Sequence, residues 1–233
     1  KEKKIEISSC LYFITENNSG YLNTFGKKNN VETFHINPNI GGRFSVLSKS
    51  SLIACEMMDV NWKKIIIGAM SAYKKLYLNG FKEINYLSNF YYKHLGKNKT
   101  NTGLISYKNN LDSFGEWFMQ LWGESLGKIR DDGLEMGLTP SRYLGPKDQH
   151  SQLQLILDGP KDKTITFISI KKSISGNKFL HRSALKEKNA TLSALKEKKV
   201  PYIELEIDFL DEKVLGELFL IFELATIILA KKM

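Results

Sequence analysis

The sequence predicts an α/β protein in which five strands form an open, mainly parallel sheet with helices on both faces. Short apolar runs of strand length alternate along the chain with longer segments of helical periodicity. This order is typical of parallel βαβ units. Turn residues such as Gly41-Gly42, Asn79-Gly80 and Gly159-Pro160 separate the segments. A hydrophobic content of 42% is that of an ordinary globular core.

The first βαβ unit is predicted near the N-terminus. Its strands are Ser8 to Thr15 and Glu32 to Asn37, with a helix at Tyr21 to Asn29 between them. Pro38 ends the second strand, because proline cannot donate to a strand ladder. A loop that contains Gly41 and Gly42 follows. Helical periodicity then continues without a strand through Val46 to Met58, Trp62 to Asn79 and Lys82 to Gly96.

The second half of the chain repeats the alternation of strand and helix. Strands are predicted at Gly103 to Tyr107, Thr164 to Ile170 and Pro201 to Ile207. Leu138 to Leu144 reads as a short extended segment outside the five strands. Helices are predicted at Leu111 to Gly127, Gln149 to Leu157, Ser183 to Lys199 and Asp211 to Ala230. We expect one domain over residues 1–233.

Composition excludes several classes of function. The chain has 34 basic and 25 acidic residues, but the lysines are spread along it, which favours a solvated surface over a nucleic-acid groove. Cys10 and Cys55 lie in apolar stretches and read as small buried thiols, and no spacing of Cys and His indicates a metal site. The charged start Lys1 to Lys4 does not resemble a signal peptide. We therefore expect a cytoplasmic protein with no metal and no membrane span.

Two polar clusters interrupt segments in which a core would favour aliphatic residues. The first, from Gln120 to Lys128, has Glu124 at its centre. Gln120 and Glu124 are four positions apart, so both side chains leave one face of the predicted helix. The apolar neighbours Leu121 and Trp122 predict that the Glu124 carboxylate is partly desolvated, which would make it a better base. An ordinary solvated glutamate is the alternative.

The second cluster, from Gly145 to Gln154, has His150 at its centre. The predicted helix from Gln149 to Leu157 places His150 at a helix N-terminus, where the positive end of the dipole favours a neutral imidazole. The alternative is a capping histidine with no chemical role. A carboxylate and a histidine together can move protons on and off carbon and oxygen.

Three segments resemble the glucose-6-phosphate isomerase (phosphoglucose isomerase) family, bacterial members in particular. They are IGGRFSVLS from Ile40 to Ser48, QLWGESLGK from Gln120 to Lys128, and GPKDQHSQLQLILDG from Gly145 to Gly159. They occur in the order in which the family carries them. The resemblance implies a flavodoxin-like sugar isomerase (SIS) domain, namely the second such domain of the enzyme. It also implies the interconversion of glucose 6-phosphate and fructose 6-phosphate, a step of glycolysis and gluconeogenesis.

The same resemblance assigns roles to five residues. Glu124 would be the base that moves a proton between C2 and C1 of the sugar through a cis-enediol intermediate. Arg43 would stabilise the charge of that intermediate, with Gly42 beside it. Gln120 would contact the substrate, and His150 would assist ring opening in the active site of the neighbouring subunit of a homodimer. No metal or organic cofactor is implied.

The sequence also departs from the family. Family members carry a Ser/Thr-rich phosphate-binding loop upstream of this region, and an aspartate-glutamine-proline turn with an active-site lysine downstream. Neither is found here, so we expect negligible isomerase activity from this chain alone. A non-catalytic module that binds a sugar phosphate is the alternative function, although it would not need Arg43 or Glu124.

Overall fold

The computed structural model describes residues 6–172 and 177–233 of the chain, which forms two compact units, residues 1–63 and 64–233. Lys1 to Lys4, the charged start noted above, lie outside the described residues. The predicted strands lie in both of these units.

The first unit contains the predicted βαβ unit. After a short 3₁₀ turn (η1, Ile7–Ser9), β1 (Tyr12–Glu16) and β2 (Glu32–Ile36) pair in parallel, and α1 (Tyr21–Asn29) connects them. The chain continues through a 3₁₀ segment (η2, Gly42–Leu47) into α2 (Lys49–Met57). Helix α3 (Trp62–Leu78) begins at the end of this unit and continues into the second.

The second unit is built on four parallel strands in the order β6-β3-β7-β8. They are β3 (Asn101–Ser106), β6 (Thr139–Leu144), β7 (Lys163–Ile170) and β8 (Tyr202–Ile207). The prediction of one five-stranded sheet was therefore wrong, because β1 and β2 form a separate two-stranded sheet. Strand β6 replaces them, and its Pro140 is tolerated because β6 is an edge strand.

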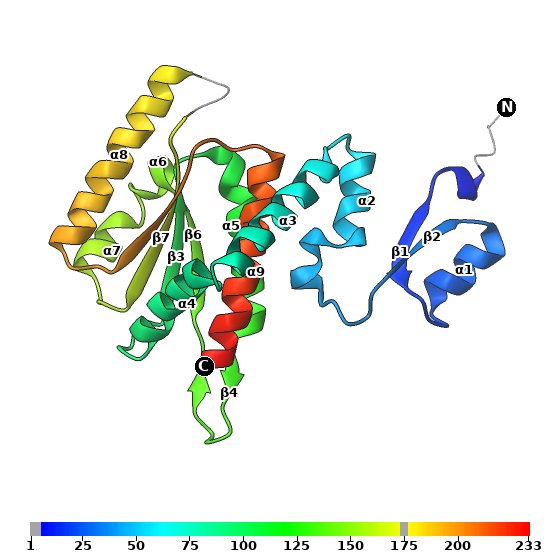
Figure 1. Ribbon diagram of the computed structural model, residues 1–233, viewed down its shortest axis with the longest axis horizontal. Helices are drawn as coiled ribbons and strands as arrows, with labels where there is room; N and C mark the ends of the chain where they lie inside the picture. The colour runs from blue at the N-terminus through cyan, green and yellow to red at the C-terminus, as the bar shows by residue number, and fades with distance from the viewer. Residues whose placement is uncertain (1–5, 173–176) are drawn as a thin grey trace. The chain divides into compact units, whose positions relative to one another are not determined.

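Helices cover both faces of this sheet, as predicted. Figure 1 shows α4 (Lys82–Leu95), α5 (Asp112–Leu126) and α9 (Glu212–Lys232) on one side. On the other side lie α6 (Gly145–Asp148), α7 (Leu153–Asp158) and α8 (Lys178–Glu197). A 3₁₀ turn (η3, Asn109–Leu111) precedes α5, and a small antiparallel hairpin of β4 (Lys128–Ile129) and β5 (Glu135–Met136) follows it.

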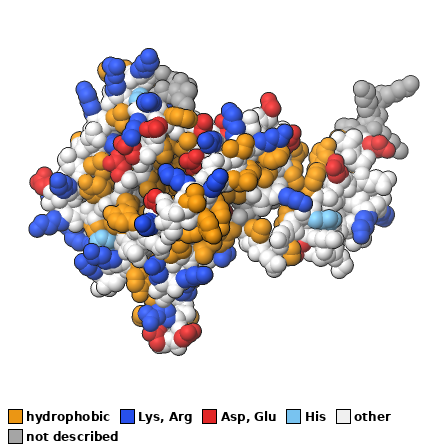
Figure 2. Space-filling view, in the orientation of Figure 1, with side chains coloured by type: hydrophobic (Ala, Val, Ile, Leu, Met, Phe, Trp, Pro, Cys, Tyr) orange, Lys and Arg blue, Asp and Glu red, His pale blue; other side chains and the backbone are white. Residues whose placement is uncertain are grey.

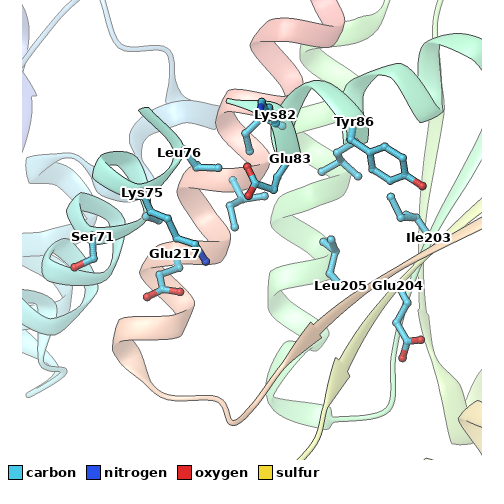
Figure 3. Close-up of a pocket in the computed structure, with 14 residues that line it drawn as sticks. Ser71, Lys75, Leu76, Lys82, Glu83, Tyr86, Ile203, Glu204, Leu205 and Glu217 are labelled. Carbon is cyan, nitrogen blue, oxygen red and sulfur yellow. The ribbon is translucent and has the colours of Figure 1, made fainter. Parts of the chain in front are cut away.

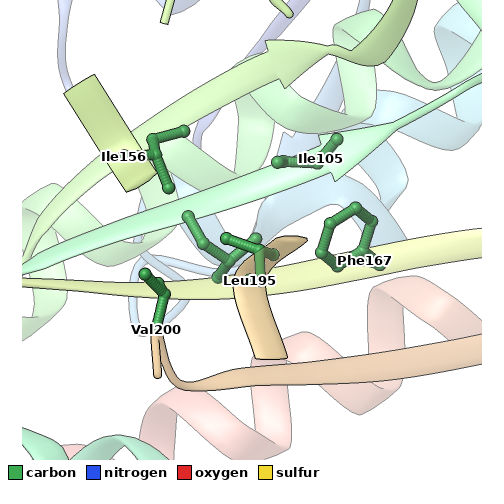
Figure 4. Close-up of a cluster of buried hydrophobic side chains, with 6 residues drawn as sticks. Ile105, Ile156, Phe167, Leu195 and Val200 are labelled. Carbon is green, nitrogen blue, oxygen red and sulfur yellow. The ribbon is translucent and has the colours of Figure 1, made fainter. Parts of the chain in front are cut away.

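Each face of the sheet has its own apolar core. On the α8 side, buried residues of β3 and β7 pack against α7 and α8, as Figure 4 shows for Ile105, Phe167, Ile156 and Leu195. On the α5 side, aromatic rings of several helices fill the space. Tyr91 of α4, Phe118 and Trp122 of α5, and Phe222 of α9 are all at most 1% exposed. Because strand side chains alternate between faces, β3 and β7 supply both cores.

Helices α3 and α9 approach closely at two glycines. A Cβ atom at Gly68 would lie 1.8 Å from the carbonyl oxygen of Lys213, and one at Gly216 would lie 1.9 Å from that of Ile65. The Asp211 side chain accepts a hydrogen bond of 2.8 Å from the Val214 amide and caps α9. No helix in the described part of the chain is long and apolar enough to span a membrane.

Two surface predictions can be compared with the structure. Cys10 is exposed and Cys55 is half-buried, so the prediction of two buried thiols was wrong. Both residues are in the first unit, where Val31 is the only buried hydrophobic residue among those described. Lys and Arg side chains are spread among acidic and apolar side chains on the face that Figure 2 shows.

Candidate functional site

Gln120 and Glu124 form a polar pair on the outer face of α5. The Gln120 amide donates a hydrogen bond of 3.1 Å from Nε2 to Oε1 of Glu124. The prediction that both side chains leave one face of a helix is confirmed. This hydrogen bond fixes the orientation of one carboxylate oxygen, while both residues remain exposed.

The predicted desolvation of Glu124 was wrong for this structure. Glu124 is exposed, whereas its sequence neighbours Leu121, Trp122 and Leu126 are fully buried. Successive residues of an α-helix are about 100° apart, so the apolar neighbours point into the core and Glu124 points away from it. Anything that shields this carboxylate from water must therefore approach from outside α5.

Arg43 and Gly42 lie at the start of the 3₁₀ segment η2 in the first unit. The Arg43 guanidinium carbon is 5.4 Å from the centre of the Phe44 ring, which helps to hold the half-buried side chain. Gly42 is exposed, and among the described residues no atom beyond its two chain neighbours lies within 4 Å of the position that a Cβ would take. The backbone at Gly42 is therefore open to close approach.

His150 lies in the turn between α6 and α7, three residues before α7 begins. Its predicted place at a helix N-terminus was wrong, because the backbone closes turns from Gly145 onward and α7 starts only at Leu153. The His150 amide donates a hydrogen bond of 3.3 Å to the carbonyl of Lys147. The imidazole is exposed.

Glu124 and His150 are not brought together within the second unit. Glu124 follows Gly123, where a Cβ would lie 3.9 Å from Cγ of Pro140 near the start of β6. His150 comes after α6, beyond the other end of that strand. At about 3.3 Å per residue, Pro140 and Leu144 are roughly 13 Å apart along β6. Helices α5 and α6 also cover opposite faces of the sheet (Figure 1).

A group of polar residues that sequence analysis missed holds the turn before His150. Gln149 donates hydrogen bonds from Nε2 to Tyr107 Oη (2.6 Å) and to Thr191 Oγ1 (2.5 Å). Tyr107 directly follows β3, and Thr191 is in α8. Tyr107 and Thr191 are 84 positions apart, so no local pattern could have linked them.

Two large grooves lie among the described residues, and neither is lined by Arg43, Glu124 or His150. In the second unit, a groove of about 710 Å³ lies beside the edge strand β8. Figure 3 shows Ile203 and Leu205 of β8 on one side of it, and Lys75 of α3 and Glu217 of α9 on the other. In the first unit, a groove of about 830 Å³ lies between the two-stranded sheet and α2. Among the described residues, no three Cys, His, Asp or Glu side chains gather as metal ligands would.

The second unit is a doubly wound α/β sheet, the class of fold that places ligand sites in loops at the carboxyl ends of parallel strands. Within that class, the chain belongs to the phosphoglucose isomerase family, whose model matches residues 4–203. The match includes the segments around Arg43, Glu124 and His150, which carried the resemblance in the sequence.

Individual relatives agree with this assignment. The chain is 33% identical to a glucose-6-phosphate isomerase of Campylobacter jejuni, over 95% of this chain and 57% of the relative. It is 34% identical to a probable glucose-6-phosphate isomerase of Methanococcus maripaludis, over 98% of this chain and 54% of the relative. The chain thus spans a little over half the length of the curated relatives that it matches.

Solved structures share the fold. A hypothetical protein of Thermus thermophilus superimposes with a TM-score of 0.82 at 26% identity, over 94% of this chain and 56% of that one. A glucose-6-phosphate isomerase of Chlamydia trachomatis superimposes with a TM-score of 0.78 at 21% identity, over 96% of this chain and 48% of that one. The second likeness concerns the fold alone.

Proposed function

We propose that the protein carrying this chain is a glucose-6-phosphate isomerase, and that the chain contributes its second SIS-type domain. The observation that carries the proposal is the exposed Gln120–Glu124 pair on α5 of a chain that belongs to this family. The substrate would be glucose 6-phosphate or fructose 6-phosphate, handled in the cytoplasm without a metal or organic cofactor.

In the proposed reaction Glu124 is the base. Its carboxylate takes the proton from C2 of the open-chain aldose. The electron pair of that C–H bond forms the C1–C2 double bond of the cis-enediol intermediate, the π pair of the C1 carbonyl moves onto O1, and a proton passes from O2 to O1. The same carboxyl group then returns its proton to C1, where the double-bond pair forms the new C–H bond, and the electron pair on O2 forms the C2 carbonyl of the ketose. Gln120 holds one oxygen of this carboxylate by its hydrogen bond, which helps to orient the group.

Arg43 would stabilise the negative charge that develops on the sugar oxygens, since a fixed cation near a developing oxyanion lowers the barrier. The open backbone at Gly42 would let the sugar approach the chain closely. Shielding of Glu124 from water would come from the parts of the full-length protein that cover α5.

His150 would assist ring opening in the active site of a second subunit. The separation of Glu124 and His150 within one chain supports this arrangement, because opposite ends of β6 and opposite faces of the sheet are too far apart for one sugar. The exposure of both side chains also suits donation across an interface. The protein would therefore be a homodimer with shared sites.

The role of Glu124 can be tested with Glu124→Gln in the full-length protein. We expect loss of C2 proton exchange with solvent by about 10²–10⁴-fold, because a general base supplies that much rate. Sugar phosphate binding should change little. The matched control is Glu135→Gln, an exposed glutamate on the β4–β5 hairpin. Exchange at the parental rate in Glu124→Gln would exclude Glu124 as the base. A parent protein that binds the sugar phosphate without exchange would instead be a non-catalytic binding module.

Shared sites can be tested by mixing two variants that each have strongly reduced but measurable activity. Glu124→Gln subunits and His150→Ala subunits should regain about a quarter of the parental activity when subunits exchange at random. Half of the dimers are then hybrids, and each hybrid has one intact site. No recovery in mixtures shown to contain hybrid dimers would mean that Glu124 and His150 serve the same site within one chain.

A further inference from the structure

The turn that carries His150 is fastened to the sheet and to α8 by a closed hydrogen-bond network. We propose that Tyr107, Gln149 and Thr191 are positioning residues that fix the direction of the His150 side chain. This inference rests on the proposed role of His150 in ring opening. None of the three residues needs to touch the sugar.

The network joins three elements that are distant in sequence. Gln149 ends α6 and immediately precedes His150, Tyr107 follows the central strand β3, and Thr191 is 3% exposed in α8. Besides the two hydrogen bonds from Gln149, Tyr107 Oη lies 2.9 Å from Thr191 Oγ1. The Gln149 side chain is thus held at both the sheet and α8.

The direction of each hydrogen bond follows from the inventory of donors and acceptors. Both N–H groups of Gln149 donate to hydroxyl oxygens. The Thr191 hydroxyl donates to the carbonyl of Glu187 at 3.0 Å, which leaves the Tyr107 hydroxyl to donate to Thr191. Burial raises the pKa of Tyr107, so its hydroxyl keeps this proton at neutral pH. Thr191 is buried, Tyr107 and Gln149 are half-buried, and a hydrogen-bond network in which every donor has an acceptor is rigid.

Further contacts hold the residues on both sides of His150. A Cβ at Gly145 would lie 2.5 Å from the Tyr107 ring, so only glycine allows α6 to start against that ring. The Asp148 carboxylate accepts hydrogen bonds from the Leu144 amide at 2.7 Å and from the Ser151 hydroxyl at 3.2 Å. His150 is therefore flanked on both sides by anchored residues.

The neighbours of His150 are anchored, but its imidazole is exposed. This contrast indicates that the network serves to fix the direction in which the His150 side chain leaves the turn. The network holds the backbone of the turn, while the His150 ring itself stays exposed. A proton-transfer group gains from such a fixed backbone, because a misplacement of about 1 Å can cost about 100-fold in rate.

The test is a double-mutant cycle in the full-length protein. Tyr107→Phe removes the hydroxyl and keeps the ring against Gly145, and Thr191→Val removes the second hydroxyl at similar volume. In the parental background each variant should lower kcat by about 10- to 100-fold with little change in KM. In a His150→Ala background the same substitutions should change kcat by less than about twofold, because a residue that acts through His150 has nothing left to position.

Tyr143→Phe is the matched control, since Tyr143 is a second half-buried tyrosine beside the same core whose hydroxyl lies outside this network. It should leave kcat unchanged in both backgrounds. An equal loss of kcat for Tyr107→Phe with and without His150 would overturn the proposal and leave the hydroxyl a merely structural role.

A second measurement separates this proposal from the proposed function. Carbon-13 relaxation of the His150 ring in the labelled protein should show larger ring motion in Tyr107→Phe and in Thr191→Val than in the parent or in Tyr143→Phe. An inactive parent would refute the isomerase function, and the ring motion alone would then decide the positioning. Unchanged ring motion in both variants would overturn it.

Discussion

Glu223 offers a sharp test of how burial in this fold controls stability. This residue of α9 has a carboxylate oxygen, Oε1, that is buried and has no hydrogen-bond partner among the described residues. Burial raises the pKa of Glu223 from its ordinary value of 4.5 to about 7. A neutral residue at this position should therefore stabilise the fold at neutral and alkaline pH.

The direction of the effect follows from proton linkage. Below pH 4.5 the Glu223 carboxyl is protonated in both folded and unfolded chains, so its pKa contributes nothing. Between pH 4.5 and about 7 the unfolded chain releases the proton while the folded chain keeps it. The free energy of unfolding therefore falls as the pH rises through this window, and the loss is complete above about pH 7.

The magnitude follows from the same pKa difference. At 1.36 kcal/mol per pKa unit, the difference between 4.5 and about 7 corresponds to a ceiling of about 3.4 kcal/mol. The residue is only half-buried, and water that reaches it reduces the penalty, so we expect about 1–3 kcal/mol.

The assay is urea unfolding of the parent, Glu223→Gln and Glu223→Leu at pH 4 and pH 8. The free energy of unfolding of each variant, taken relative to that of the parent, should be about 1–3 kcal/mol larger at pH 8 than at pH 4. Changes in shape or hydrogen bonding affect both pH values equally and cancel in this comparison. A difference that is the same at pH 4 and pH 8 for both variants would refute the reasoning.

Two further predictions concern packing and a partly buried ion pair. Gly216→Ala should lower the free energy of unfolding by about 1–3 kcal/mol because its Cβ meets the backbone of α3. Gly123→Ala should raise the free energy of unfolding by about 0.5–1 kcal/mol, because Gly123 is exposed and its Cβ would make only an ordinary contact of 3.9 Å with Pro140. Chemical denaturation of both variants checks the contrast, and equal effects would contradict it. Lys188→Met should lower the free energy of unfolding by about 1–3 kcal/mol at neutral pH, because the partly buried Glu204 carboxylate loses its cation and keeps only the hydrogen bond from Ser169. Burial alone would raise the pKa of Glu204, but the hydrogen bonds from Lys188 and Ser169 hold it below its usual value, so this cost should shrink as the pH falls through the range in which Glu204 is protonated. A cost that does not depend on pH would mean that Lys188 stabilises by packing alone.

Patterns within a few residues of one another were readable from the sequence. Helix α1 occupies the predicted residues Tyr21–Asn29, and α3 and α4 end within one residue of the predicted ends. The Gln120–Glu124 pair was predicted from its spacing alone. Helical periodicity and a four-residue spacing depend only on local geometry, so the chain encodes them locally. The family, too, could be recognised from three short motifs.

Pairing of strands could not be read in the same way. Strand β6 contains Pro140, Ser141 and Arg142, which are poor signals for a strand, yet it pairs along β3. Its place is secured by contacts with α5, since Arg142 forms ion pairs with Asp112 and with Glu116 there. The strands β1 and β2 carry stronger signals but pair only with each other.

The sequence by itself determined the α/β class, the family and the helix face that carries Glu124. Only the tertiary structure decided the burial of each site residue, the opposite placement of Glu124 and His150, and the network from Tyr107 to Thr191. The physical reason is that burial and long-range hydrogen bonds depend on which elements pack together. A hydrogen bond across 84 positions leaves no periodic trace in the chain, whereas a helix turn leaves one every three or four residues.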